Sequence, residues 1–185
     1  EKNLNLSIAL ACRKELQNYN CKAVMTRTTD VYVSLAERKR ISDTNNAEIF
    51  VSIHNNAFTA TARGFETFID SGFVWPHTAG YRDIMHDIVY AYLKTLNVPD
   101  RGKKRGNYYV TREPQASCVL MEYLFVTNIQ DAALLKQAEV LEKLGKLTAI
   151  GIAQALKLEP KAAPEPPSEI AKLRLENDRL VEESD

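Results

Sequence analysis

The stretch EIFVSIH, residues 48–54, has the composition of a buried β-strand and ends at a histidine. Its apolar residues follow one another almost without interruption, which is typical of a strand covered on both faces. The stretch SCVLME, residues 117–122, has the same character and ends at a glutamate. Three further stretches, 22–27, 64–69 and 107–112, also have strand-like composition. We predict that these segments form one sheet.

Segments with apolar residues at helical spacing alternate with these strands. They predict helices at residues 3–19, 35–46, 80–97, 128–137 and 139–157. Ser34 and Glu37 form a capping-box pattern at the start of the second helix, and Asn128 is expected to cap the fourth. Strands that alternate with helices favour an α/β fold, with a mostly parallel, twisted sheet and helices on both of its faces.

The composition changes near Pro160, where a Pro- and Ala-rich stretch without apolar periodicity follows the last helix. We therefore expect one folded domain at 1–158, a semi-rigid linker at 159–168 and a helical tail at 169–185. In the tail, Asn177 stands among leucines and an isoleucine at heptad spacing, as in two-stranded coiled coils. This interpretation predicts a homo-oligomer that forms through the tail. The alternative is a short, solvated helix.

The overall composition excludes several classes of protein. The 185 residues include 24 basic and 24 acidic side chains, so net charge provides no attraction to nucleic acid or to anionic lipid. No apolar run is long enough to insert across a membrane. The three cysteines form no CxxC pair, which argues against a thiolate metal site and against a disulfide framework. Free cysteines are consistent with synthesis in a reducing compartment.

Polar residues at the ends of buried strands are the candidates for a functional site, because ligands of open α/β sheets bind beyond the carboxyl ends of the strands. His54 and Glu122 hold these positions, and a carboxylate is costly to bury unless it is paired or lines a site. Glu1, three residues before Leu4, would project from the buried face of its helix. The alternatives are a solvated His54, an exposed Glu122, and a Glu1 favoured only by the helix dipole.

Histidine and glutamate together are ligands that zinc accepts, and a catalytic zinc takes three protein ligands and a water. His54 and Glu1 would supply two of the three. His77 and His86 do not end strands and are expected on the surface. Either the third ligand is missing from the printed chain, or the interpretation as a zinc site is wrong.

Six segments of the chain occur in an order that is characteristic of a known family. They are EKNLNL (1–6), TRTTD (26–30), LAERKRISDTNNAEIFVSIHNNA (35–57), GFETF (64–68), RGKKRGNYYVTR (101–112) and VLMEYLFVTN (119–128). With these segments, the sequence resembles the zinc-dependent N-acetylmuramoyl-L-alanine amidases of the amidase 3 family, which includes bacterial cell-wall enzymes and phage endolysins. The resemblance covers residues 1 to about 157.

The resemblance implies a role for each candidate residue. Glu1 and His54 correspond to zinc ligands, and Glu122 corresponds to the catalytic carboxylate. Asn56 is a candidate substrate contact, with a turn or capping role as the alternative. The remaining ligand of the family is a histidine in a glycine-rich turn after the first strand. The printed sequence starts after that turn, so we expect that strand and that ligand to be absent from it.

The resemblance also implies an activity and a place of action. The expected reaction is zinc-dependent hydrolysis of the amide between N-acetylmuramic acid and L-alanine in peptidoglycan, by a secreted enzyme or by an endolysin released at lysis. Because only two ligands are visible, a second hypothesis stays open. In that hypothesis the chain is a catalytically silent module that binds or assembles at the cell wall.

Overall fold

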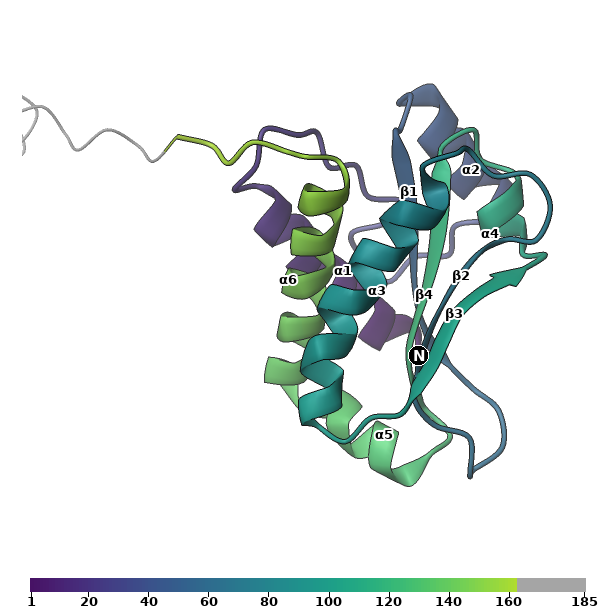
Figure 1. Cartoon of the computed structure of the whole chain (residues 1–185), viewed down its shortest axis with the longest axis vertical. Helices are drawn as coiled ribbons and strands as arrows, with labels where there is room; N and C mark the ends of the chain where they lie inside the picture. Colours follow the sequence, from purple (N-terminus) through teal and green to yellow (C-terminus); the bar gives the residue numbers. More distant parts are fainter. Residues whose placement is uncertain (163–185) are drawn as a thin grey trace, which may run out of the picture.

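The computed structural model describes residues 1–162 and shows an α/β fold around a four-stranded sheet (Figure 1). The strands are β1 (Ile49–Asn56), β2 (Phe65–Asp70), β3 (Asp100–Gly106) and β4 (Ser117–Phe125), and they lie in the order β1-β4-β2-β3. β1 pairs with β4, and β2 with β3, in parallel, whereas β2 and β4 are antiparallel. The predicted α/β class and mostly parallel sheet are confirmed.

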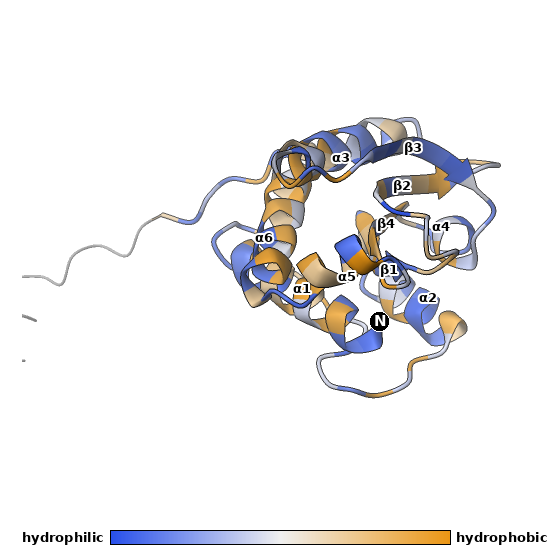
Figure 2. Ribbon diagram, turned by 90° about the horizontal axis from the view of Figure 1, so that it is seen from below, coloured by the Kyte–Doolittle hydropathy of each residue, from blue (hydrophilic) through white to orange (hydrophobic). Residues whose placement is uncertain are grey.

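Helices lie on both sides of this sheet (Figure 1). One side is covered by α1 (Lys2–Leu16), α3 (Thr78–Thr95) and α6 (Ala138–Ala155). The short helices α2 (Leu35–Thr44) and α4 (Tyr109–Arg112) lie on the other side, and α5 (Ile129–Leu135) follows β4. Figure 2 shows many hydrophobic residues along α6. It shows hydrophilic residues along β3, which lies at the outside of the molecule. None of the helices within residues 1–162 has the length and apolarity needed to cross a bilayer.

The two predicted helix caps are confirmed. The Ser34 hydroxyl accepts a hydrogen bond from the backbone N–H of Glu37 at 3.1 Å. The Asn128 side-chain oxygen accepts from the N–H groups of Gln130 at 3.0 Å and Asp131 at 3.2 Å. These bonds satisfy N–H groups that have no partner inside the helix, and so they define where α2 and α5 begin.

Two predicted strands are wrong. Residues 107–112 form the end of a loop and the helical turn α4, and the strand in this region is β3, at Asp100–Gly106. β3 is an edge strand whose side chains meet water, so its sequence DRGKKRG lacks the apolar pattern by which strands are recognised. The aromatic and β-branched residues of 107–112 have strand-like composition, but β-propensity depends strongly on tertiary context.

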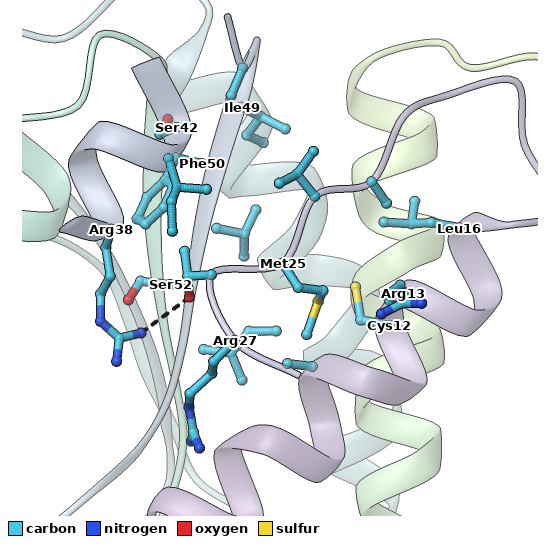
Figure 3. A pocket seen from close by; sticks show the side chains of 18 of the residues that line it. Cys12, Arg13, Leu16, Met25, Arg27, Arg38, Ser42, Ile49, Phe50 and Ser52 are labelled. Atoms are coloured by element: carbon cyan, nitrogen blue, oxygen red, sulfur yellow. Dashed lines mark hydrogen bonds between the residues drawn. The ribbon is translucent and has the colours of Figure 1, made fainter. Parts of the chain in front are cut away.

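The other wrong strand, residues 22–27, is an irregular segment that pairs with no strand of the sheet. It lies beside a cavity of about 820 Å³ that separates it from the outer edge of β1 (Figure 3). The cavity is lined by Met25 of this segment, by Cys12 and Leu16 of α1, and by Ile49 and Phe50 of β1. Because no strand fills this space within residues 1–162, the 22–27 segment lacks the ladder hydrogen bonds that define a strand.

The expected linker and tail fall largely outside the described residues. The described chain ends at residue 162, just after a single bridge between Tyr19 and Pro160. The remaining linker residues and the predicted helical tail at 169–185 therefore stay predictions, as does self-association through that tail.

Candidate active site

The structure brings His54 and Glu122 together at one edge of the sheet. The two residues face each other as Cα partners on the parallel strands β1 and β4. Since the strands run in the same direction, their carboxyl ends lie at the same edge, which brings the two residues together as predicted. Neither residue ends its strand, however, because β1 continues to Asn56 and β4 to Phe125. The regular pairing breaks just after His54, between that residue and Asn56. This irregularity changes the direction of the chain at the site.

Glu1 reaches the same place from α1. It precedes the first residue of the helix, and its Oε1 lies 3.1 Å from Nδ1 of His54. Asn5, one turn further along, donates its side-chain N–H to the same oxygen at 3.2 Å. The Asn5 oxygen accepts in turn from the side chain of Asn55 at 2.7 Å. Because this chain of contacts links α1 to β1, Glu1 is held beside His54, with about 40% of each side chain still exposed.

Glu122 is the carboxyl group of the site without a hydrogen-bonded partner. Its Oε2 is buried and makes no hydrogen bond within residues 1–162. Burial raises the pKa of Glu122 to about 8, and the negative charges of Glu1 and Glu66 contribute in the same direction. A carboxyl group with this pKa holds a proton for much of the time at neutral pH, and so can both accept and release one there.

Asn56 makes its side-chain contact inside the protein. Its Nδ2 donates to Oε1 of Glu66 at 2.7 Å, and its Oδ1 accepts from the backbone N–H of Ala57. Glu66, on β2, is buried and is the Cα partner of Glu122 across the antiparallel pair. Arg101 and Lys104 of β3 both form ion pairs with it. These contacts place Asn56 beside the candidate site and orient its amide toward a second buried carboxylate.

Sequence reasoning missed this second carboxylate, although a signal was present. Glu66 stands between Phe65 and Thr67 in the strand-like stretch GFETFI, and the cost of burying a carboxylate applies to it as it does to Glu122. Arg101 and Lys104 were missed because β3 was not recognised as a strand.

The remaining histidines lie away from this cluster. His77 is exposed, as predicted. The expectation of a surface position is wrong for His86, which is buried and stacks on Phe65 with 4.7 Å between ring centroids. His86 Nδ1 lies 2.9 Å from the Thr67 hydroxyl, and Nε2 lies 3.1 Å from Oδ1 of Asp100. Burial lowers the pKa of His86, so the neutral ring is favoured in this part of the core.

Glu1 and His54 fit two positions of a zinc site. A tetrahedral zinc with bonds of about 2.0–2.1 Å holds neighbouring ligand atoms about 3.3 Å apart, close to the observed 3.1 Å. An imidazole nitrogen and a carboxylate oxygen are also the right donors for this metal. Within residues 1–162, however, no group of three histidine, cysteine, aspartate or glutamate side chains is arranged to hold a metal ion. The pair therefore fits two of the three protein ligands of a catalytic zinc site, and such a site would need one further ligand.

Comparisons with known proteins agree with this arrangement. The model of the family described as N-acetylmuramoyl-L-alanine amidase matches residues 1–154. The N-acetylmuramoyl-L-alanine amidase CwlM of Bacillus licheniformis is 40% identical over 165 residues, which are 88% of this chain and 63% of the relative. The endolysin of Bacillus phage SPP1 is 34% identical over 164 residues, 88% of this chain and 60% of the relative. The chain therefore spans less than two thirds of the length of these two curated relatives.

A solved structure shows the same fold. The catalytic domain of CwlV, an N-acetylmuramoyl-L-alanine amidase from Bacillus (Paenibacillus) polymyxa, superimposes with a TM-score of 0.78 at 27% sequence identity. The match covers 86% of each chain. The fold that surrounds the candidate site is thus the fold of an amidase catalytic domain.

Proposed function

The chain belongs to the N-acetylmuramoyl-L-alanine amidase family, amidase 3, and on this basis we propose that it hydrolyses the amide between N-acetylmuramic acid and L-alanine in peptidoglycan. The observation that carries the proposal is the position of Glu122. The Oε2 atom of Glu122 is buried and unpaired within residues 1–162, and this carboxyl group, with a pKa of about 8, lies on the strand next to His54, which contacts Glu1. A carboxyl group with so raised a pKa, beside other titratable side chains, is typical of a catalytic acid or base.

We propose zinc as the cofactor, with Glu1 and His54 as two of its ligands. When bound, zinc lowers the pKa of a coordinated water and polarises the carbonyl of the amide. Asn5 fixes the Glu1 carboxylate by donating to it, which is the support that metal ligands commonly receive from neighbouring side chains. Two protein ligands hold zinc less tightly than three. The affinity of this chain for zinc therefore measures whether Glu1 and His54 bind the ion alone or together with a third ligand.

Glu122 moves the proton in the proposed reaction. Its carboxylate takes a proton from the attacking water and returns it to the nitrogen of L-alanine as the amide bond breaks. A zinc ion bound beside Glu122 would lower this pKa from its metal-free value of about 8, and general acid–base catalysis is most effective when the pKa lies near the working pH. Asn56 and Glu66 lie beside this path, and we propose that Asn56 helps to orient the substrate.

Digestion of purified peptidoglycan tests the reaction. We expect the protein, supplied with zinc, to release stem peptides with new amino-terminal L-alanine, detected by mass spectrometry. Glu122→Gln should reduce turnover by about 10²- to 10⁴-fold, the usual contribution of a general acid–base. Glu113→Gln, at a partly exposed glutamate paired with Arg112, is the matched control and should leave turnover unchanged. Cleavage within the glycan instead of at L-alanine would refute the assignment.

Zinc titration separates this proposal from a catalytically silent wall-binding module. An amidase should bind about one zinc per complete domain, lose activity with a chelator and regain it when zinc is restored. Glu1→Ala and His54→Ala should each weaken zinc binding, whereas Glu122→Gln should not. Binding to peptidoglycan without zinc uptake and without turnover would favour the silent module. In either case the proposed place of action is the cell wall, because the substrate is there.

A further inference from the structure

Arg101 is fixed on the site face of the sheet by three neighbours. Its aliphatic stem packs on Gly64, where an added Cβ would lie 3.0 Å from Cγ of Arg101. The guanidinium carbon lies 4.9 Å from the ring centroid of Phe125, and Nε donates to Oε2 of Glu66 at 3.0 Å. A side chain held by packing, a cation–π contact and an ion pair has lost most of its rotamer freedom before any ligand arrives.

The open end of this side chain, which consists of its two terminal nitrogens, has no hydrogen-bond partner within residues 1–162. In total, 34% of the Arg101 side chain is exposed. Lys104 also pairs with Glu66, so one buried carboxylate faces two cations. One of these two cations is enough to neutralise Glu66, so Lys104 can keep this carboxylate paired while the free end of Arg101 binds a ligand.

The chemistry of the open end identifies the class of ligand. A guanidinium group presents its N–H donors as a planar fork that matches the two oxygens of a carboxylate. We propose that Arg101 is a specificity-determining residue that binds a free carboxylate in the peptide part of the substrate. In the proposed substrate the negative groups belong to the peptide, since the hydroxyl and N-acetyl groups of the glycan are neutral.

The position of Arg101 fits this role. β3 lies two strands from β4, and strands are spaced about 4.8 Å apart, so the backbone at Arg101 is about 10 Å from that at Glu122. An extended peptide covers this distance in about three residues. A carboxylate within the first residues after the cleaved amide can therefore reach Arg101 while the amide lies beside Glu122. This inference rests on the proposed function, because it takes the substrate from it.

Ligand binding tests the inference without turnover. The probes are two muramoyl dipeptides whose terminal γ-carboxyl group is blocked as a methylamide and that differ in one group. The first has a free α-carboxylate on its D-glutamate residue, and the second has a carboxamide there. Calorimetry or NMR titration with the Glu122→Gln full chain should show tighter binding of the carboxylate. Adding Arg101→Ala should weaken binding of the carboxylate about 10- to 100-fold, as for a lost charged hydrogen bond, and leave the carboxamide nearly unchanged.

Two further variants make the result decisive. Arg101→Lys keeps the charge but not the fork, so it should retain part of the preference. Lys103→Ala is the matched control, because Lys103 is on the same strand but pairs with Asp87 of α3 on the opposite face. Equal weakening of both ligands by Arg101→Ala, or no preference for the carboxylate before that change, would overturn the inference. Wild-type protein that binds selectively but releases no L-alanine termini would instead refute the proposed function alone.

Discussion

The contact between α1 and α6 leaves no room for a methyl group at Gly145, and we predict that Gly145→Ala destabilises the fold. A Cβ at this position would lie 2.6 Å from Cβ of Ala11 and 2.8 Å from the backbone nitrogen of Cys12, and would also collide with the carbonyl oxygen of Ile8. Two of these three atoms belong to the backbone of α1, so no side-chain rotation can relieve the overlap. The helices must instead move apart.

Two effects of opposite sign decide the magnitude. Alanine favours a helix interior over glycine by about 1 kcal/mol. Overpacking a core typically costs about 1–3 kcal/mol, and the backbone contacts of Gly145 favour the upper end of that range. We therefore expect a net loss of about 2 kcal/mol. Because α1 also carries Glu1 to His54, a shift of this helix should weaken zinc binding as well.

A second glycine provides the control. Gly80, in the first turn of α3, has no atom within 4 Å of an added Cβ. Gly80→Ala should therefore gain stability, by about 0.5–1 kcal/mol, from helix propensity alone. Urea denaturation followed by circular dichroism measures both variants. If Gly145→Ala were as stable as Gly80→Ala, the close approach of α1 and α6 would be wrong.

Two further predictions concern protonation and capping. Without metal, the pKa of Glu122 is about 8 in the folded protein and 4.5 in the unfolded chain. Between these two pH values the folded protein binds more protons than the unfolded chain, so the free energy of unfolding should fall as the pH rises from 4.5 to 8. Urea denaturation at pH 5 and pH 8 should show a smaller difference in Glu122→Gln, and an equal difference would contradict the raised pKa. Asn128→Ala should cost about 1 kcal/mol, since Asn128 accepts from two N–H groups of α5. A loss below 0.3 kcal/mol in the same assay would show that water replaces this cap.

The core of the candidate site was accessible from the sequence. His54 and Glu122 follow apolar stretches that are typical of buried strands, and parallel strands bring their carboxyl ends to one edge. Helical spacing likewise directed Glu1 toward the sheet. These inferences depend on local sequence patterns and on chain direction. The tertiary contacts of these segments are compatible with both, so the predictions agree with the structure. The same local patterns located most of the helices, and both predicted caps, within a few residues.

The charged side of the site was not accessible in the same way. β3 has no apolar alternation, because an edge strand can place charged side chains in water. Its pairing with β2 is what places Arg101 and Lys104 on Glu66. The order of the strands in the sheet cannot be predicted from local composition.

The sequence by itself determined the α/β class and the order of motifs that indicates the family, and it led to Glu1, His54 and Glu122 as the residues proposed for the site. Tertiary structure alone decided that Glu66 faces Glu122, that Arg101 is held with its open end free, and that 22–27 forms no strand. The physical reason is the range of the interactions. Periodicity and capping act within a few residues, whereas strand pairing and the burial of a charge depend on segments far apart in the chain.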